Sequence, residues 1–386
     1  MKKILLFLFL IPQILFAQYN WCGTADKMLT NSPTEKEQSL MQKIRTTIAN
    51  SSNSKSQDSL LIIPTVVHIV HFNGNGNITD LQVQDGMRVV NEDFRRQNAD
   101  TINGNPLFYP FAADCKIEFR LAKLDPNGDS TTGITRTDTS IYPHPEPTNA
   151  NFNNVKYIVS WPPNMYFNIW LVRHISGGAL GYAQYPGTAF TYGGPWETYG
   201  PTIRSYEWGT IGTSNSDGRV GTHEIGHCLG LYHTFLSFST GCGAECDTTG
   251  DQVCDTPPTT PTYDCDTSNL CANDLLGPSA FTVDMPDQLE NYMSYNDCQN
   301  LFTLGQKTRM RGFLTTLDTL NGLYLDDNLI ATGLMQTTAI TELPNTKNRK
   351  LLKIVDILGR ETLPKRNTTL FYIYNDGTVE KSIVVE

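Results

Sequence analysis

The chain lacks several features that whole classes of protein need. It has no basic tract, and its formal net charge is −10 at pH 7, which argues against nucleic acid as a partner. Beyond the N-terminus, no apolar run reaches the roughly 20 residues that a membrane-spanning helix requires. Histidine is scarce, with 7 among 386 residues, so a local concentration of histidines carries information. A chain of this length can hold one large domain or two of moderate size.

The N-terminus has the pattern of a secretory signal peptide over residues 1–17. Lys2 and Lys3 form the charged start, an apolar run follows, and Ala17 precedes the expected cleavage point. The apolar run is too short for a membrane anchor, so we expect no membrane span in the mature form. Residues 18–58 are polar with little to build a core, and we expect them to be a pro-segment.

Nine cysteines in an exported chain favour disulfides over metal thiolates. Six of them lie in a stretch with little apolar periodicity after the middle of the chain: Cys242, Cys246, Cys254, Cys265, Cys271 and Cys298. This stretch is therefore expected to be a loop-rich subdomain held by disulfides. Cys22, Cys115 and Cys228 lie outside it, and the odd total leaves one thiol unpaired unless it bonds another chain or a metal.

Three of the seven histidines fall within eleven residues, in a pattern typical of a zinc site. His223 and His227 are four residues apart, so on a helix both imidazoles face one ion at about 2.0–2.1 Å. Gly230 allows a sharp exit from the helix, which returns His233 as a third ligand. Glu224 can act on a metal-bound water without being a ligand. Three protein ligands leave one position open, which marks a catalytic rather than a structural zinc site. A helix with ordinary core histidines would not need the glutamate and the glycine at these positions.

Cys22 lies in the expected pro-segment and has two interpretations. A thiolate is a strong zinc ligand, so Cys22 can fill the open fourth position until the segment is removed. The alternative is a disulfide, for example with Cys115. The residues alone leave both open.

Apolar patterning predicts an α/β domain with a mixed sheet over residues 59–325. Leu60 to His71 reads as a buried strand, and Thr79 to Arg96 as an amphipathic helix capped by Thr79 or Asp80. The other elements are predicted as strands over Lys116 to Ala122 and Tyr166 to Ile175, the zinc helix from Asp217 or Gly218, and a closing helix over Leu301 to Leu320.

Leu180 to Pro186 is short and bounded by glycine, which suits a strand at the edge of the sheet. An edge strand offers unpaired backbone groups to which an extended peptide can add. We therefore expect protein or peptide substrates to bind there. A plain sheet edge covered by a loop is the alternative.

An acidic loop follows the zinc motif. Asp247, Asp251 and Asp255 can supply oxygen ligands to calcium, and the carbonyl groups of Val253 and Thr256 can add to them. The pattern does not match the helix–loop–helix calcium signature. A solvated acidic loop without metal is the alternative.

The C-terminal part of the chain changes character. Residues 326–344 read as a linker, and residues 345–386 as a small β unit without a catalytic constellation. Its strands are expected near Leu351, over Thr369 to Tyr374 and over Val379 to Val385, with a hairpin turn at Asn375-Asp376-Gly377.

The zinc stretch resembles the metzincin clan of zinc endopeptidases, whose HExxHxxGxxH pattern it meets in full. Met293, in Asn291-Tyr292-Met293-Ser294-Tyr295, is similar to the methionine that this clan places in a tight turn beneath the zinc. Two further stretches resemble the pappalysin-like family within the clan: Leu231-Tyr232-His233-Thr234-Phe235 and Gly250-Asp251-x-Val253-x-Asp255-Thr256-Pro257.

This resemblance covers roughly residues 60–325. It implies a zincin-like α/β (α+β) fold, in which a twisted mixed sheet and the active-site helix form an upper subdomain. Irregular, disulfide-rich loops form the lower subdomain.

Several site assignments come from the resemblance. It implies the disulfides Cys246–Cys271 and Cys265–Cys298, with Cys242–Cys254 as an extra pair. It implies calcium at Asp251, Val253, Asp255 and Thr256, and a zymogen in which Cys22 caps the zinc. Met293 and Gly230 are then structural, and Cys228 is a buried free thiol.

Residues 345–386 resemble the C-terminal sorting domain of the type IX secretion system, in Ile354 to Arg360 and Tyr372 to Lys381. This implies that secretion machinery recognises the tail. The protein is then expected outside the cell or on its surface, after passage through the periplasm.

Together these features predict a secreted zinc metalloendopeptidase. Zinc lowers the pKa of its bound water from about 15.7 toward about 7. Glu224 takes the proton as water attacks the scissile carbonyl and delivers it to the leaving amine. Tyr295 is placed to donate a hydrogen bond to the oxyanion, with core packing as its alternative role.

Two other functions remain open from the residues alone. One is a non-enzymatic surface adhesin that keeps a zinc-stabilised fold, against which the intact Glu224 argues. The other is a zinc amidase acting on cell-wall substrates, against which an edge strand beside the zinc argues.

Overall fold

A computed structural model of the chain describes residues 22–24, 39, 42–46, 59–141, 149–150, 154–186, 196–213, 215–235, 242, 246–247, 250–266, 268–272, 274–275, 277–336, 350–365, 367–375, 377 and 379–383. The chain divides into two compact units, residues 1–335 and 336–386. The predicted signal peptide and most of the predicted pro-segment lie outside the described residues.

The larger unit is built on a six-stranded mixed sheet in which β1 (Leu61–His71) is central. The first half of β1 pairs in parallel with β2 (Ile117–Leu121), and the second half with β3 (Ile134–Asp138). Along its other edge β1 pairs in parallel with β5 (Phe167–Val172). Two short strands complete the sheet: β8 (Thr202–Arg204), parallel to β5, and the edge strand β7 (Gly181–Tyr182), antiparallel to β8.

β1 can occupy the middle of the sheet because both of its faces are apolar. Successive side chains of a strand point to opposite faces. Ile63, Val67 and Ile69 face the main core, whereas Val66 and Val70 lie in two smaller clusters. A strand buried on both faces reads as a continuous apolar run, as in the sequence here.

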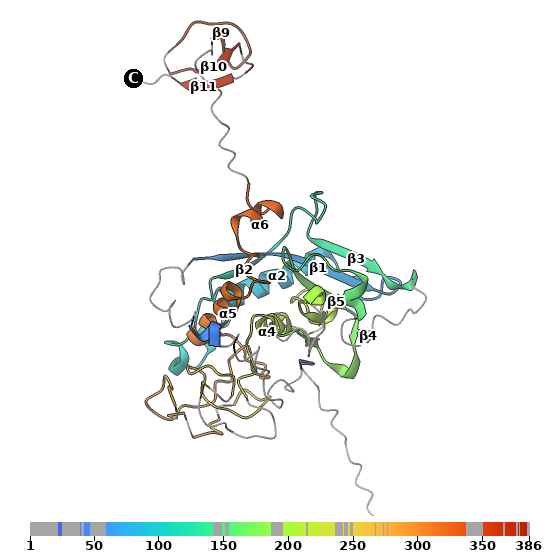
Figure 1. Ribbon diagram of the computed structural model, residues 1–386, viewed down its shortest axis with the longest axis vertical. Helices are drawn as coiled ribbons and strands as arrows, with labels where there is room; N and C mark the ends of the chain where they lie inside the picture. The colour runs from blue at the N-terminus through green and yellow to red at the C-terminus, as the bar shows by residue number, and fades with distance from the viewer. Residues whose placement is uncertain are drawn as a thin grey trace, which may run out of the picture. The chain divides into compact units, whose positions relative to one another are not determined.

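Two helices pack together on the main core. The first, α2 (Asp80–Phe94), is capped by Thr79, whose Oγ1 accepts a hydrogen bond from the backbone N–H of Gln82. The second, α4 (Arg219–Cys228), begins after Gly218 at φ 82°. Figure 1 shows α4 beneath the sheet and the loops of residues 250–300 beneath α4.

Trp208 joins the two helices, a packing that sequence patterning did not indicate. Its indole N–H donates to the backbone carbonyl of Val83 at 3.1 Å. A Cβ at Gly86 on α2 would lie 2.2 Å from Trp208 Nε1, and one at Gly221 on α4 would lie 2.9 Å from its ring. Both glycines therefore admit the indole between the helices.

The remaining elements are α3 (Asn154–Ile158), α5 (Leu304–Thr316), α6 (Asp326–Ala331), the paired strands β4 (Asn149–Ala150) and β6 (His174–Ile175), and 3₁₀ turns at Ala99–Asn103, Pro106–Phe108, Thr139–Ile141, Ser176–Gly178, Trp196–Thr198 and Ser205–Glu207. α5 begins with a reciprocal capping box between Thr303 and Gln306. The zincin-like mixed α/β fold agrees with the prediction, although β3, β4, β8, α3 and α6 were not predicted.

The disulfides of the lower loops correct the predicted pairing. The structure contains Cys265–Cys298 as expected. The other four cysteines pair as Cys242–Cys271 and Cys246–Cys254, so the implied pairs Cys246–Cys271 and Cys242–Cys254 are wrong. The turns between Cys246 and Cys254 bring their Cα atoms to 4.9 Å, within the 4.4–6.8 Å that a disulfide usually spans. Sequence spacing does not reveal such local closure.

The predicted linker begins too early. The chain continues as helix α6 from Asp326, and Leu329 of this helix is buried. The Thr332 carbonyl accepts hydrogen bonds from the backbone of Lys123 and Leu124. These contacts extend the larger unit to Met335, ten residues beyond the predicted end at residue 325.

The smaller unit is a three-stranded antiparallel sheet. β10 (Thr369–Tyr374) lies between β9 (Leu351–Val355) and β11 (Val379–Ile383). The strands agree with the sequence pattern, while the predicted role of this tail in export stays a prediction. In the described ranges of the chain, no helix is long and apolar enough to cross a membrane.

Candidate metal centre

Helix α4 and the turn after it bring three histidines together. His223 and His227 lie one turn apart on α4. The chain then turns at Gly230, whose φ of 93° is in the left-handed region. A Cβ at Gly230 would lie 2.2 Å from the ring of Phe313, so any other residue would clash. This turn returns His233 toward the helix.

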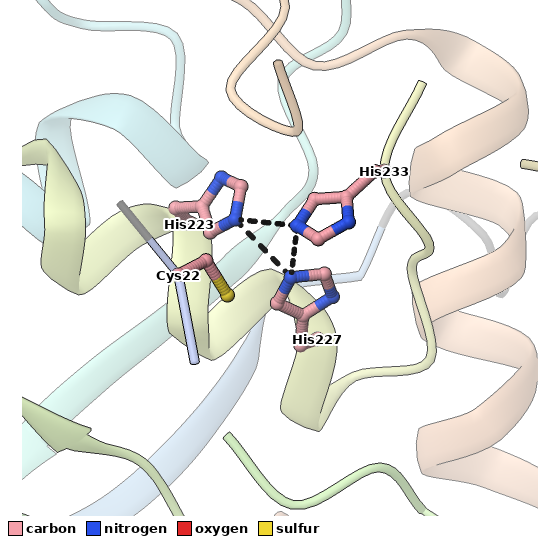
Figure 2. A group of neighbouring side chains, drawn as sticks. All are labelled: Cys22, His223, His227 and His233. Atoms are coloured by element: carbon pink, nitrogen blue, oxygen red, sulfur yellow. Dashed lines mark hydrogen bonds between the residues drawn. The ribbon is translucent and has the colours of Figure 1, made fainter. Parts of the chain in front are cut away.

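The Nε2 atoms of the three histidines point at one place, as Figure 2 shows. Nε2 of His223 lies 3.1 Å from that of His227 and 3.2 Å from that of His233, and the third separation is 3.1 Å. Nitrogens bound to one tetrahedral zinc at about 2.0–2.1 Å lie roughly 3.3–3.4 Å apart. The spacing therefore fits a single ion.

Hydrogen bonds behind the rings determine which nitrogen carries the proton. Nδ1 of His223 lies 2.7 Å from the Tyr292 carbonyl, and Nδ1 of His227 lies 2.8 Å from the Leu231 carbonyl. A carbonyl can only accept, so Nδ1 holds the proton and Nε2 presents a lone pair. Two lone pairs at 3.1 Å repel each other unless a cation lies between them. The donor set therefore fits a bound metal.

Burial keeps these imidazoles neutral, the form that binds metal. It lowers the pKa of His223 to about 3. It also lowers the pKa of His227 far below its ordinary value, and the neighbouring His233 acts in the same direction. Both side chains are thus in the metal-binding form at neutral pH.

Cys22 of the predicted pro-segment supplies a fourth donor. Its Sγ and the three histidine nitrogens all lie within 4.8 Å of one another, and Cys22 is 4% exposed. Figure 2 shows the sulfur directed at the three rings. Cys22 and Cys115 are both free and buried, so the alternative of a disulfide between them is wrong.

The segment around Cys22 lies along the edge strand β7. Cys22 forms a parallel bridge with Gly181, and the Gly23 N–H donates to the Gly181 carbonyl at 2.8 Å. Gly181 has no side chain, and a Cβ there would lie 2.7 Å from Cγ of Glu224. The predicted substrate strand thus passes directly beside the predicted base. Residues 42–46 are helical, and Ile44 is buried in the main core, so a second part of the predicted pro-segment also packs on this unit.

Thr24 connects this segment to Glu224, a contact that sequence analysis missed. Its hydroxyl donates to Oε2 of Glu224 at 3.0 Å and accepts from the Ala183 N–H at 2.8 Å. Glu224 is fully buried. Burial raises the pKa of Glu224 to about 8, while hydrogen bonds from Cys22 and Thr24 and the charge of Lys156 act in the opposite direction. The motif Cys-Gly-Thr was visible in the sequence, but only the fold brings its threonine to the glutamate.

Met293 and Tyr295 lie against the histidines. Met293 is fully buried, and a Cβ at Gly226 would lie 2.5 Å from its sulfur, so the methionine packs under α4. The ring of Tyr295 is 4.9 Å from that of His233 and 5.9 Å from that of His223. Tyr295 therefore borders the centre, where both of its predicted roles are feasible.

The acidic loop brings only part of the predicted calcium set together. The Thr256 hydroxyl lies 2.8 and 2.9 Å from the two oxygens of Asp251 and 2.7 Å from the Val253 carbonyl. Asp255 instead accepts hydrogen bonds from the Thr303 hydroxyl and the Gly305 N–H, at the start of α5. Its carboxylate is thus engaged as a helix cap rather than with the other oxygens.

Two buried cations near the centre were also missed. Arg309 of α5 donates to the Gly230 carbonyl at 2.6 Å and to the Tyr185 hydroxyl at 2.9 Å, so it supports the turn before His233. Lys156 donates to the Thr198 and Gly200 carbonyls behind the edge strand, and burial lowers its pKa to about 7. Neither residue belongs to a recognisable motif.

Comparison with known proteins identifies the family. Residues 150–315 match the profile of peptidase family M43, described as pregnancy-associated plasma protein-A. An extracellular metalloprotease of Colletotrichum graminicola is 31% identical over 261 residues, which make up 66% of this chain and 76% of that protein. The chain belongs to the pappalysin-like family of metalloproteases.

Solved structures agree with this assignment. Mature mirolysin of Tannerella forsythia, in complex with a cleaved peptide, is 34% identical with a TM-score of 0.59, over 72% of this chain and 98% of that one. A mutant of Tannerella forsythia promirolysin is 30% identical with a TM-score of 0.62, over 81% of this chain and 99% of that one. The prediction of a zinc metalloendopeptidase with a metzincin fold is confirmed. The pappalysin-like assignment favours this function over the adhesin and amidase alternatives.

Proposed function

We propose that this chain is a secreted zinc endopeptidase made as a zymogen, in which Glu224 is the general base and Cys22 blocks the metal position. The observation that carries the proposal is the convergence of the Cys22 sulfur with the three Nε2 atoms. Three imidazoles and one thiolate complete a tetrahedral zinc shell and leave no position for water. The segment carrying Cys22 would have to leave before catalysis.

In the active form, His223, His227 and His233 would hold the metal. Zinc supplies Lewis acidity toward a water molecule and toward the substrate carbonyl. Glu224, one residue after His223 and fully buried, takes the proton from the water and passes it to the leaving amine. The Tyr295 hydroxyl donates a hydrogen bond to the carbonyl oxygen, which becomes negative as the carbonyl is attacked.

The substrate of this proposal is an extended peptide. It binds along β7, within the predicted strand Leu180 to Pro186, by backbone hydrogen bonds of the kind Gly23 makes with Gly181. A cleaved peptide is present in the mirolysin complex, which supports this substrate class. In the zymogen the segment of Cys22 occupies that strand and competes with the substrate.

Glu224→Gln tests the base. The change keeps the shape of the side chain and removes its ability to take a proton. After removal of the pro-segment, kcat/KM on a peptide should fall by about 10²–10⁴-fold while zinc content stays as in the wild type. Glu92→Gln, at an exposed carboxylate paired with Arg88, is the control and should retain full activity. Normal cleavage by the Glu224 variant would rule out the mechanism.

Cys22→Ala tests the block. Without the sulfur, the fourth position opens to water in the uncleaved chain. Peptide hydrolysis by the uncleaved chain should rise by more than about tenfold, because the fraction of open sites sets the apparent activity. Cys115→Ala removes another buried thiol, outside the metal centre, and should leave the precursor inactive. Equal latency of the Cys22 variant and the wild type would refute the block.

Calcium at the acidic loop is a further part of the proposal. Both Asp251 oxygens, the Val253 carbonyl and the Thr256 hydroxyl lie close together and are the ligand types calcium prefers. The Asp255 carboxylate and the Thr256 carbonyl, also predicted as ligands, need not take part.

Removal of calcium by a chelator that spares zinc should destabilise the protein. If calcium is present at about 100 times its dissociation constant, the melting temperature should fall by roughly 5–10 °C. Asp251→Asn should abolish this shift, whereas Asp266→Asn in the same region should preserve it. If the chelator had no effect on the melting temperature of the wild type, the alternative would hold, namely an acidic loop that binds no metal.

Export through a signal peptide and the C-terminal tail completes the proposal. Relatives of this chain are named extracellular metalloproteases, and three disulfides are typical of an exported protein. In a host with a type IX system, the full chain should reach the medium or cell surface. A chain lacking residues 345–386 should stay in the periplasm, measured by immunoblot of the fractions. Equal export of both would show that the tail is not a sorting signal.

A further inference from the structure

Asp93 is a buried carboxylate without a role in the proposed chemistry. It lies in the last turn of α2 and is 2% exposed. Its Oδ2 accepts a hydrogen bond from the Thr222 hydroxyl at 2.7 Å, and its Oδ1 accepts one from the Tyr292 hydroxyl at 2.7 Å. Burying a charge costs free energy, so a carboxylate in this place needs hydrogen-bond donors or a positive charge beside it.

The two hydroxyls that donate to Asp93 belong to the two segments that hold His223. Thr222 lies on α4, immediately before the ligand His223. Tyr292 lies immediately before Met293, and its backbone carbonyl accepts the hydrogen bond from Nδ1 of His223. One carboxylate thus connects the backbone that carries His223 to the backbone that orients its ring.

A positive charge lies beside this connection. Nε of Arg219, also on α4, is 3.7 Å from Oδ1 of Asp93. The guanidinium is 2.8 Å from Asp100 and lies 5.6 Å from the centre of the Tyr292 ring. Arg219 therefore offsets the burial of Asp93 and packs on the same tyrosine.

We propose that Asp93 is a positioning residue for the zinc ligand His223, acting through Thr222 on one side and Tyr292 on the other. The proposal rests on the proposed zinc function. A carboxylate can accept from both hydroxyls at once. An amide offers one acceptor oxygen, and its NH₂ group cannot accept, so Asp93→Asn leaves one of the two hydroxyls without its acceptor.

We expect the loss of this hydrogen bond to weaken metal binding directly and to affect peptide hydrolysis only through the metal. A histidine ligand binds well when its second nitrogen is held by a fixed acceptor, and disturbing such partners typically costs 10- to 100-fold in metal affinity. If α4 and the Tyr292 segment shift relative to each other, the Tyr292 carbonyl moves away from Nδ1 and the His223 ring is free to turn.

The test measures zinc affinity in the full chain, by competition with a chromophoric chelator. Asp93→Asn and Tyr292→Phe should each raise the zinc dissociation constant by about 10- to 100-fold. Tyr292→Phe is the sharper variant, because it removes the hydroxyl but keeps the carbonyl that accepts from His223. Asp80→Asn, on the same helix and half exposed in an ion pair with Arg136, is the matched control and should leave zinc affinity unchanged.

A second readout separates positioning from plain stability. In the cobalt-substituted chain, the visible absorption of the metal reports the geometry of its ligands, and it should change in Asp93→Asn and Tyr292→Phe but not in Asp80→Asn. Melting of the metal-free chain is measured alongside. If Asp93→Asn fails to fold, Tyr292→Phe and Thr222→Val carry the test.

Variants that melt earlier but keep wild-type zinc affinity and cobalt spectrum would overturn the proposal and leave Asp93 a structural residue. The proposed peptidase function would still hold in that case, provided that the wild type binds zinc and, once processed, cleaves peptides. A wild-type chain that binds no zinc would instead defeat the proposed function itself.

Discussion

The structure depends on one electrostatic constraint: the Nε2 atoms of three imidazoles face each other across about 3 Å, and those of His223 and His227 present lone pairs. Nδ1 of His223 and of His227 donates to a backbone carbonyl, so neither ring can turn its lone pair away without losing a buried hydrogen bond. The two lone pairs repel each other at this distance, and a cation between them removes the repulsion. Gly230, Phe313 and Arg309 fix the turn that brings in the third ring.

The same site gives a physical basis for the proposed zymogen, which would be inactive without being misfolded. The edge strand β7 passes beside Glu224 because Gly181 has no side chain to prevent it. The segment of Cys22 uses that strand, directs its sulfur at the histidines and places the Thr24 hydroxyl on Glu224. In the proposed zymogen, three consecutive residues thus occupy the proposed substrate strand, metal position and general base. Removal of a single short segment would free all of them together.

Patterns that are local in the sequence predicted the structure well. The zinc helix, β1, α2, β5 and the three strands of the smaller unit follow from apolar periodicity and from short motifs, because each depends on neighbouring residues. The histidine ligands and Met293 also follow from motifs. Features set by distant contacts were missed. Asp93 and Tyr292 are 199 positions apart, and Thr24 and Glu224 are 200 apart. Two of the three predicted disulfides were wrong because Cys246 pairs with Cys254, only eight positions further on, and spacing alone does not reveal such a local closure.

The central claim is that one zinc ion is held by three histidines and, in the precursor, by Cys22. X-ray absorption at the zinc edge, on the purified uncleaved chain, tests it most directly. We expect three nitrogen neighbours at about 2.0–2.1 Å and one sulfur at about 2.3 Å, with the sulfur replaced by oxygen after removal of the pro-segment. A shell without sulfur in the uncleaved chain would contradict the block by Cys22. A chain without stoichiometric zinc would contradict the proposed zinc site itself.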